Sequence, residues 1–411
     1  MKKLHYLSYM DAYNLALDKV PKQTTTEITL IDKALDRVLA EDIIVVKNLP
    51  SFDNSAMDGF AFKYEERGQR LRIVNTIFAG DKPEAMLEKS SCYKIMTGAQ
   101  VPSDADTIVP IEDCSELNEE SVTIPKDIQQ GNAFRYKGEE QKVDNILFHA
   151  GEHITPAHIA LLSAQGIMAV KVYKSLEIAV VSTGDEIKEP WQSASEDEIY
   201  NANAFAITSQ LEKYGFIARY AGSIPDSLEK STSFIEALKH YDVIITTGGI
   251  SMGDADFLEE AFINNGLEAL FHGIDVKPGR PTMMGTMGNT FVMAMPGNPL
   301  TAMVNIFLLS LPILSKMQGN SAYHHTFIYA KNTKTFKVRA GRANVVLGAL
   351  IEGEFHVTRN NKYGSGMLTP IVESNALVVL HDSISLVEEG DMVKVILFDT
   401  FPNSQNNKTM N

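Results

Sequence analysis

Strand-like and helix-like patterns alternate between residues 174 and 322. Short, continuous apolar runs predict buried strands at 176–181, 217–223, 243–247 and 290–295. Apolar residues at helical spacing predict the intervening helices at 202–214, 228–240, 255–265 and 300–317. This alternation is typical of a doubly wound α/β domain, in which helices cover both faces of a mostly parallel sheet.

The pattern changes on both sides of this segment. Helical spacing predicts helices at 8–20 and 29–42, and again within 141–173. Short β-rich runs between Gly, Pro and Asp turns predict a small β domain over 51–140, with strands at 71–78, 92–96, 107–111 and 121–124. Similar runs predict a small C-terminal barrel or sheet, with strands at 326–330, 344–351, 376–380 and 392–398.

Composition and charge argue against several classes of protein. The chain of 411 residues has a net charge of −15, so a nucleic-acid backbone would be repelled and such a partner is not expected. Its two cysteines, Cys92 and Cys114, lack metal-ligand spacing, which fits a reducing compartment such as the cytoplasm. No signal segment is expected after Met1. The most apolar run, 302–314, is short for a membrane span and is interpreted as a buried core helix.

Loops that follow the predicted strands of the α/β segment are the expected ligand-binding places. Two carboxylates and two hydroxyls meet in 182–186 (STGDE), although an acidic surface turn would give the same sequence. The glycine-rich stretch 246–256 (TTGGISMGDAD) precedes a helix, whose N-terminus could bind an anion. Asp254 could instead be a simple helix cap, an explanation that is weaker for Asp256.

Two further loops combine cations, prolines and a helix start. Lys277 and Arg280 flank a Pro-Gly turn in 276–281 (VKPGRP), which favours a preorganised oxyanion site in an otherwise acidic protein. The alternative is a surface turn with two solvated cations. The loop 295–301 (MPGNPLT) opens a helix with Pro299 near its first turn, and a helix-start turn alone would also explain it.

Six segments together carry a resemblance to a known family. They are SFDNSAMDGFAF from residue 51, IMTGAQVP from 95, VVSTGDEI from 180, TTGGISMGDADF from 246, VKPGRP from 276 and MPGNP from 295. In this order they resemble the molybdopterin molybdenumtransferase (MoeA) family, whose eukaryotic relatives include the gephyrin E domain and its plant counterpart. The likeness extends over nearly the whole chain.

The resemblance implies an architecture, a reaction and partners. The implied domains are a discontinuous N-terminal dimerisation domain (1–50 and 141–173), a β-rich domain (51–140), an α/β molybdopterin-binding domain (174–322) and a C-terminal β-barrel (323–411). The expected assembly is an elongated homodimer. The expected reaction inserts molybdate into adenylylated molybdopterin with Mg²⁺-dependent release of AMP. The adenylyltransferase that makes this substrate and the acceptor molybdoenzymes are candidate protein partners; no membrane is expected.

The family pattern also assigns roles to residues. By position, Glu186, Asp226 and Asp256 are the expected metal ligands, and Mg²⁺ commonly binds a few carboxylates together with phosphate oxygens and water. Asp58 and Thr97 complete the expected catalytic set, in a site shared with the partner chain. The residues expected to bind molybdate or substrate are Lys277, Arg280, Pro296, Pro299, Thr301, Ser365, Gly248, Gly249 and Ser251.

Three positions depart from the family pattern. Leu347 stands where the family often has an arginine, so one anion contact is missing or Arg339 or Arg342 replaces it. Glu140 replaces an aspartate, and Thr301 replaces a common serine while keeping the hydroxyl group. The change at Leu347 is the one expected to weaken molybdate binding.

Two other functions compete with molybdenum insertion. An adenylyltransferase would share the α/β domain, but isolated versions are short single-domain proteins without FDNSAMDG or a fourth domain. A scaffold or inactive paralogue would bind cofactor intermediates without turnover. Leu347 supports this second alternative, whereas the intact carboxylate set opposes it.

Overall fold

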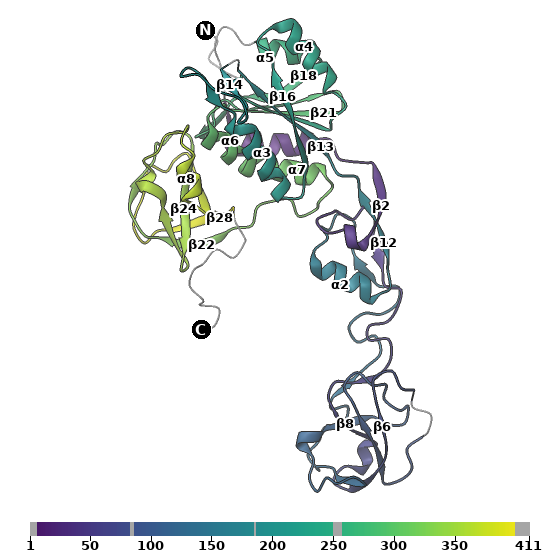
Figure 1. The fold of residues 1–411 in the computed structure, drawn as a ribbon. Coiled ribbons are helices and arrows are strands. Elements are labelled where there is room, and N and C mark those ends of the chain that lie inside the picture. The colour runs from purple at the N-terminus through teal and green to yellow at the C-terminus, as the bar shows by residue number, and fades with distance from the viewer. Residues whose placement is uncertain (1–5, 83–85, 185, 250–256, 399–411) are drawn as a thin grey trace. The chain divides into compact units, whose positions relative to one another are not determined.

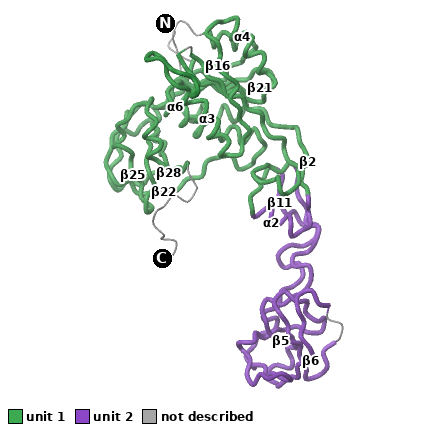
Figure 2. The backbone as a smooth tube through the Cα atoms, viewed as in Figure 1, with its two compact units in different colours: residues 1–40, 151–156, 169–411 green, residues 41–150, 157–168 purple. Residues whose placement is uncertain are grey.

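The chain folds into two compact units, shown in green and purple in Figure 2. A computed structural model describes residues 6–82, 86–184, 186–249 and 257–398. The first unit comprises 1–40, 151–156 and 169–411, and the second comprises 41–150 and 157–168. The first unit holds the α/β domain and the C-terminal barrel, and the second holds a β-rich domain.

The α/β domain, drawn in teal and green in Figure 1, is built on a six-stranded sheet in the order β16-β13-β17-β21-β20-β18. The first four strands are parallel, whereas β20 and β18 run antiparallel to their neighbours. The strands are β13 (Glu177–Thr183), β16 (Ile217–Ile224), β17 (Val243–Thr247), β18 (Leu267–His272), β20 (Met283–Met287) and β21 (Thr290–Met295). The four strands predicted from apolar runs are confirmed as the parallel part of the sheet.

Helices cover both faces of this sheet, as predicted for a doubly wound domain. One face packs against α1 (Tyr9–Lys19), α3 (Ala202–Lys213), α6 (Pro299–Asn305) and α7 (Leu311–Met317), and the other against α4 (Leu228–Ala237) and α5 (Phe257–Asn264). Within β13, Ile178 and Val180 belong to the first apolar cluster, and Ala179 and Val181 to the second. Successive strand residues point to opposite faces, so both faces of β13 are buried.

The most apolar helical stretch lies inside this domain. A π-helical turn, Ile306–Ser310, joins α6 to α7. Among the described residues, the combined stretch Pro299–Met317 is the one helix long and apolar enough to cross a bilayer, with a mean hydropathy of 1.6, but 83% of it is buried within the protein. The prediction of a buried core helix is therefore confirmed.

The C-terminal domain is a closed barrel, because β24 pairs with both β25 and β26. Its strands are β22 (Ile328–Asn332), β24 (Ala343–Ile351), β25 (Glu354–Val357), β26 (Ala376–Leu380) and β28 (Met392–Leu397), and α8 (Thr369–Val372) precedes β26. Two further short strands of this domain, β23 (Phe336–Lys337) and β27 (Leu386–Val387), form a separate antiparallel pair. Beyond β24 the sheet continues into β19 (Ile274–Lys277) and β1 (Leu7–Ser8) through parallel pairs. Strand β19 thus ties the α/β domain to the barrel.

The helix predicted at 29–42 is wrong. Strand β2 (Thr26–Leu30) pairs antiparallel with β12 (Ala169–Tyr173), and a short 3-10 turn, Ile31–Lys33, follows it. Asp36 has a φ of 62°, which cannot occur inside a right-handed helix. Leu30 and Leu35 are 54% and 48% exposed, so their helical spacing does not mark a buried helix face.

The second unit contains a five-stranded sheet in the order β8-β5-β7-β6-β9. Its strands are β5 (Gly59–Phe62), β6 (Arg70–Ile77), β7 (Ser91–Ile95), β8 (Thr107–Pro110) and β9 (Ser121–Thr123), which confirms the predicted β-rich segment. Short pairs join β3 (Ile43–Ile44) to β11 (Ile146–Phe148) and β4 (Asn54–Ser55) to β10 (Phe134–Arg135), and α2 spans Pro156–Ala164. Cys92 and Cys114 are free, and burial raises the pKa of the Cys92 thiol to about 12.

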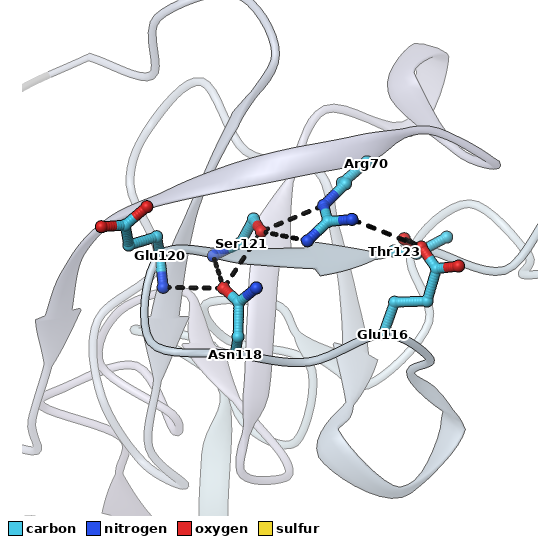
Figure 3. A network of polar contacts seen from close by, with 6 residues as sticks. All are labelled: Arg70, Glu116, Asn118, Glu120, Ser121 and Thr123. Carbon is cyan, nitrogen blue, oxygen red and sulfur yellow. Dashed lines mark hydrogen bonds and ion pairs between the residues drawn. The ribbon is translucent and has the colours of Figure 1, made fainter.

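Polar side chains organise the turn that leads into β9 (Figure 3). Arg70 donates from Nε and Nη2 to Ser121 Oγ at 3.1 and 3.0 Å, and pairs with Glu116 at 3.7 Å. Asn118 Oδ1 accepts from the backbone nitrogens of Glu120 and Ser121. Exposed contacts of this kind contribute little free energy, so we interpret the network as fixing the turn geometry.

Candidate active site

A cavity of about 980 Å³ lies at the C-terminal ends of the parallel strands, and we call it the strand-end cavity. Thr183 at the end of β13, Asp226 after β16 and Gly248 after β17 all line it. Pro296 and Pro299, from the loop after β21, line it as well. This is the place where open α/β sheets bind ligands, because the loops of neighbouring parallel strands converge there.

Two predicted carboxylates face this cavity. Glu186 and Asp226 both line it, and Gly184 leaves the room that the Glu186 side chain occupies. A Cβ atom at Gly184 would lie 2.6 Å from Glu186 Oε2, and its φ of 119° also favours glycine. The structure therefore brings two of the three predicted metal ligands to one cavity.

The remaining predicted ligand, Asp256, lies outside the described residues, as does Ser251. Within the described ranges, no group of three or more His, Cys, Asp and Glu side chains could hold a metal ion. Two carboxylates nevertheless suit Mg²⁺, which usually takes its other ligands from phosphate oxygens and water. The donor set of the strand-end cavity thus fits a cation that is bound together with a phosphorylated substrate.

Gly248 and Gly249 allow two strand ends to approach closely. Their φ angles are 89° and 68°, and a Cβ atom on either would lie 2.8 or 2.7 Å from Thr183 Oγ1. Side chains at these positions would separate the loop after β17 from the end of β13. The two predicted glycines therefore expose their backbone to the cavity without a side chain. A ligand can approach this backbone closely.

Asn203 is a site residue that the sequence reasoning missed. Its Nδ2 donates to Thr247 Oγ1 and to the Gly297 carbonyl oxygen, both at 2.7 Å, so it joins the loops after β17 and β21. Its Oδ1 is buried without a partner among the described residues. Asn201 already caps α3 by accepting from the Ala204 nitrogen at 3.1 Å. Asn203 lies two positions after this cap and is not needed to cap the helix. A second asparagine at this place was the sequence feature that could have marked Asn203 as a site residue.

A second cavity of about 730 Å³ concentrates positive charge, and we call it the cationic cavity. Its lining includes five cationic side chains: Lys277, Arg280, Lys337, Arg339 and Arg342. Of these five, only Arg280 makes a salt bridge within the described parts of the chain. The predicted residues Thr301 and Ser365 line the same cavity. Four unneutralised cations around one cavity favour an anionic ligand.

The loop that carries Lys277 and Arg280 is held from beneath. Buried Asn305 donates from Nδ2 to the Gly279 carbonyl oxygen at 3.3 Å and to Thr282 Oγ1 at 2.7 Å. Arg280 Nη2 donates to Asp275 Oδ1 at 2.8 Å, and its guanidinium group lies 4.6 Å from the centre of the Tyr6 ring. Arg280 Nε is buried without a partner among the described residues, so it can donate to a ligand.

The two cavities adjoin each other. Pro281, Pro296 and Asn298 line both of them, and Asn298 Nδ2 donates to Ser365 Oγ at 3.0 Å. An elongated ligand could therefore extend from the carboxylates of the strand-end cavity to the cations of the cationic cavity.

Comparison with known proteins assigns this architecture to a family. Three family models match consecutive parts of the chain: the MoeA N-terminal region (domain I and II) at 7–166, the "Probable molybdopterin binding domain" at 179–316 and the MoeA C-terminal region (domain IV) at 329–398. The molybdopterin molybdenumtransferase of Haemophilus influenzae is 32% identical over 401 residues, which cover 96% of this chain and 99% of that protein. The chain belongs to the MoeA family.

Other MoeA proteins show the same likeness in sequence and in structure. The molybdopterin molybdenumtransferase of Bacillus subtilis is 30% identical over 390 residues, covering 92% of this chain and 90% of its own. The crystal structure of the molybdopterin biosynthesis MoeA protein from Pyrococcus horikoshii OT3 superposes with a TM-score of 0.82 at 25% identity, covering 96% of this chain and 100% of that one. The family fold therefore extends over almost the whole chain.

Leu347, the departure from the MoeA pattern, does not line the cationic cavity. Its side chain is 1% exposed and belongs to the main apolar cluster of the first unit. It lines a different, apolar cavity of about 320 Å³ together with Phe307 and Phe398. Arg339 and Arg342, the two suggested replacements for a missing arginine, do line the cationic cavity.

In the second unit, the structure brings Asp58 and Thr97 together. The Thr97 backbone nitrogen and its Oγ1 both donate to Asp58 Oδ1 at 2.7 Å. The hydrogen bond from the Thr97 backbone, followed by that from its side chain, lowers the pKa of Asp58. The lowered pKa keeps Asp58 ionised. Because the pair is exposed, a ligand or a partner chain can reach this carboxylate.

Proposed function

We propose that this MoeA protein transfers molybdenum from molybdate to adenylylated molybdopterin and releases AMP. The observation that carries the proposal is the pair of adjoining cavities, one with carboxylates and one with five cations. Adenylylated molybdopterin is an elongated molecule with a pyrophosphate group, and molybdate is a small oxyanion. The cations match molybdate directly, and the carboxylates match the pyrophosphate once a divalent cation is bound between the like charges. The family's curated members are named for this transfer.

The cationic cavity would hold molybdate. Arginine and lysine form charge-assisted hydrogen bonds to oxyanions, and arginine can do so through two parallel N–H groups. Arg280 Nε lacks a partner among the described residues, and Lys277, Arg339 and Arg342 form no salt bridge within them. Ser365 and Thr301 would add hydroxyl donors. Pro296 and Pro299 would shape the passage to the neighbouring cavity.

The strand-end cavity would hold the pyrophosphate of the substrate. Glu186 and Asp226, with Asp256, would be the residues that bind Mg²⁺, which supplies charge neutralisation at the phosphates when it is present. Gly248 and Gly249 would let backbone approach the phosphate oxygens. Asn203 would keep the loops after β17 and β21 at a fixed spacing while the substrate binds.

The proposed assembly is a homodimer. On β2, alternate residues share a face of the strand, and Ile28 and Leu30 are 78% and 54% exposed. Exposed apolar side chains on one face of a strand pair suit a protein interface, and a second copy of the chain would cover them. Asp58 and Thr97 would then complete the cavity of the partner subunit. The net charge of −15 would repel a nucleic-acid backbone, so no such partner is proposed. The proposed location is the cytoplasm, on the ground that the two cysteines suggest no disulfide framework.

An insertion assay tests the proposed function. Purified protein is mixed with adenylylated molybdopterin, Mg²⁺ and molybdate, and AMP release is measured together with the reconstitution of a molybdenum-dependent apoenzyme. We expect both signals to require molybdate. A second arm supplies ATP and molybdopterin, from which only an adenylyltransferase would form the adenylate. Binding of the adenylate without AMP release would instead identify a scaffold and contradict the proposal.

A further inference from the structure

A surface loop borders the strand-end cavity, and we call residues 187–200 the rim loop. Strands β14 (Ile187–Lys188) and β15 (Ile199–Tyr200) pair in parallel and bring its two ends together. Ile187, Ile199 and Tyr200 line the cavity. Ile199 and Tyr200 are 59% and 52% exposed, so a ligand in the cavity can reach them.

The rim loop is held by hydrogen bonds within itself. The Glu189 nitrogen donates to Gln192 Oε1 at 2.9 Å, and the Ser195 nitrogen donates to Glu198 Oε2 at 2.8 Å. Lys188 Nζ lies 2.9 Å from Glu198 Oε1. These contacts link both arms of the loop, so it is a preorganised element.

A polar network also fastens the rim loop to the sheet. Tyr220, on β16, donates its hydroxyl to Glu189 and lies 2.9 Å from Ser182 Oγ, on β13. Asn201 Nδ2 donates to the same hydroxyl at 3.1 Å. Burial raises the pKa of Tyr220 to about 12, so this hydroxyl keeps its proton over the physiological range. The apolar residues of the loop are therefore presented to the cavity at a fixed place.

The charge of the loop selects the part of a ligand that it can contact. The rim loop contains four acidic side chains and one lysine, and that lysine is paired with Glu198. A phosphate group would be repelled there, whereas the cationic cavity attracts it. A flat, uncharged ring can contact the Tyr200 ring, or the isoleucines on the other face of the strand pair, without this penalty. Aromatic and aliphatic side chains bind such rings by stacking and by burial of apolar area.

We propose that the ring of Tyr200, at the edge of the cavity that Ile187 and Ile199 also line, is a stacking surface for the flat heteroaromatic ring of the adenylylated substrate. The inference rests on the proposed function, because that function supplies a ligand with two such rings, an adenine and a pterin. The phosphates of this ligand would lie towards the carboxylates and the cationic cavity, and one ring would lie against the rim loop.

Calorimetric titration of the full chain with AMP, and separately with 6-hydroxymethylpterin, tests the stacking surface. We expect Tyr200→Ala to weaken the binding of one of these ligands on the order of five- to a hundredfold, the range for loss of a ring-stacking partner. The ligand that loses affinity identifies the ring. Tyr200→Phe keeps the aromatic face and should bind like the wild type. Tyr329→Ala, at a tyrosine that is 66% exposed on the barrel, is the matched control and should leave both affinities unchanged.

Trp191, the only tryptophan of the chain, reports whether each variant keeps the loop folded. Its ring packs edge-on against Phe205 with 5.9 Å between ring centroids, so its fluorescence emission should be unchanged. If Tyr200→Ala alters that emission, Ile199→Ser provides a second variant. It should weaken the binding of AMP or of 6-hydroxymethylpterin, whichever ring lies against the loop.

Unchanged affinity for both ligands in the folded variants would overturn the stacking surface. So would a wild-type protein that releases AMP in the insertion assay and yet binds neither ring. A protein that neither binds a ring nor releases AMP would contradict the proposed function itself, and the stacking surface with it.

Discussion

The guanidinium group of Arg280 has two contacts that fix its position and one donor that no described residue satisfies. Asp275 fixes one end of its guanidinium group at 2.8 Å and the Tyr6 ring lies 4.6 Å from it, while Nε is buried without a partner among the described residues. An unsatisfied buried donor costs about 1–3 kcal/mol, more on a charged group. A bound oxyanion that accepts from Nε would recover this energy, so the residue is prepared for a ligand before the ligand arrives.

Replacing Arg280 should therefore weaken molybdate binding. Loss of one charge-assisted hydrogen bond costs about 1.5–3 kcal/mol, so Arg280→Ala should raise the half-saturating molybdate concentration about ten- to a hundredfold. A molybdate titration of AMP release measures this, with circular dichroism as the folding control. Since Arg339 and Arg342 line the same cavity, alanine at either should shift the titration in the same direction. A half-saturating concentration that stays constant in all three variants would remove the cationic cavity from the mechanism.

Restoring the arginine of the family pattern should not improve binding. Leu347 is buried among apolar side chains, so Leu347→Arg would place a charge there without a partner and destabilise the first unit by several kcal/mol. The urea midpoint should fall, and the molybdate titration should gain no affinity. Leu347→Met, which nearly conserves volume, should cost less than about 1.5 kcal/mol and serves as the control. Tighter molybdate binding by a stable Leu347→Arg protein would show that this position does reach the anion.

At the scale of elements, the strands of the α/β domain were predictable and their lateral connections were not. Continuous apolar runs such as 243–247 mark strands buried on both faces, and a predicted parallel sheet already places ligands at the strand ends. The approach of Arg339 and Arg342 to Lys277 depends instead on the pairing of β19 with β24. That pairing joins Val276 to Ala343, 67 residues apart in sequence, and the spacing of apolar residues carries no information about such a contact. The sequence marks Asn203 as an asparagine that the helix cap does not need, but its two partners, Thr247 and Gly297, depend on the same kind of long-range contact.

Asn203 offers a test of how far loop spacing controls the site. Asn203→Ala removes the two hydrogen bonds that link Thr247 to the Gly297 carbonyl. Each such bond contributes about 0.5–1.5 kcal/mol to stability. The loops would then no longer be fixed relative to each other, so we expect the KM for the adenylate to rise and kcat to fall. Steady-state AMP release measures both constants. Asn320→Ala, at an asparagine that bonds Ser315 and lines neither site cavity, is the matched control. Equal effects of the two substitutions would reduce Asn203 to a general stabilising role.

At the scale of the whole molecule, opposite charges are separated within an acidic protein. The net charge is −15, yet five cations gather at one cavity while Glu186 and Asp226 face the cavity next to it. Two carboxylates that line one cavity are ligands of the kind that Mg²⁺ prefers. The acidic cavity should therefore respond to divalent metal even without substrate.

We expect Mg²⁺ to raise the unfolding temperature. Binding to the folded state alone contributes about 2.7 kcal/mol when the free metal is a hundred times its Kd. Glu186→Gln and Asp226→Asn should each reduce the shift measured by differential scanning calorimetry. Glu212→Gln, at an exposed residue of α3 that does not line the cavity, should keep it. A full metal response in both cavity variants would mean that the metal binds elsewhere.

The dimer hypothesis can be tested by complementation. Asp58 and Glu186 lie in different compact units, so a site completed by the partner chain needs one intact copy of each residue. Mixing inactive Asp58→Ala and Glu186→Gln proteins should restore part of the AMP release once subunits exchange, because some hybrid sites contain both carboxylates. Exchange is followed by differently labelled subunits in native mass spectrometry. No recovery after complete exchange would show that the site is not shared.

The short strand β1 has a practical consequence for how the protein is produced. Leu7 and Ser8 pair with Ile274 and Asp275 at the start of the strand that ends at Lys277, and Tyr6 contacts Arg280. Residues 6–8 are thus part of the support for the anion-binding loop. An affinity tag or protease scar joined close to Tyr6 would lie near the anion-binding loop. A change in anion binding that it caused could be mistaken for a property of the enzyme.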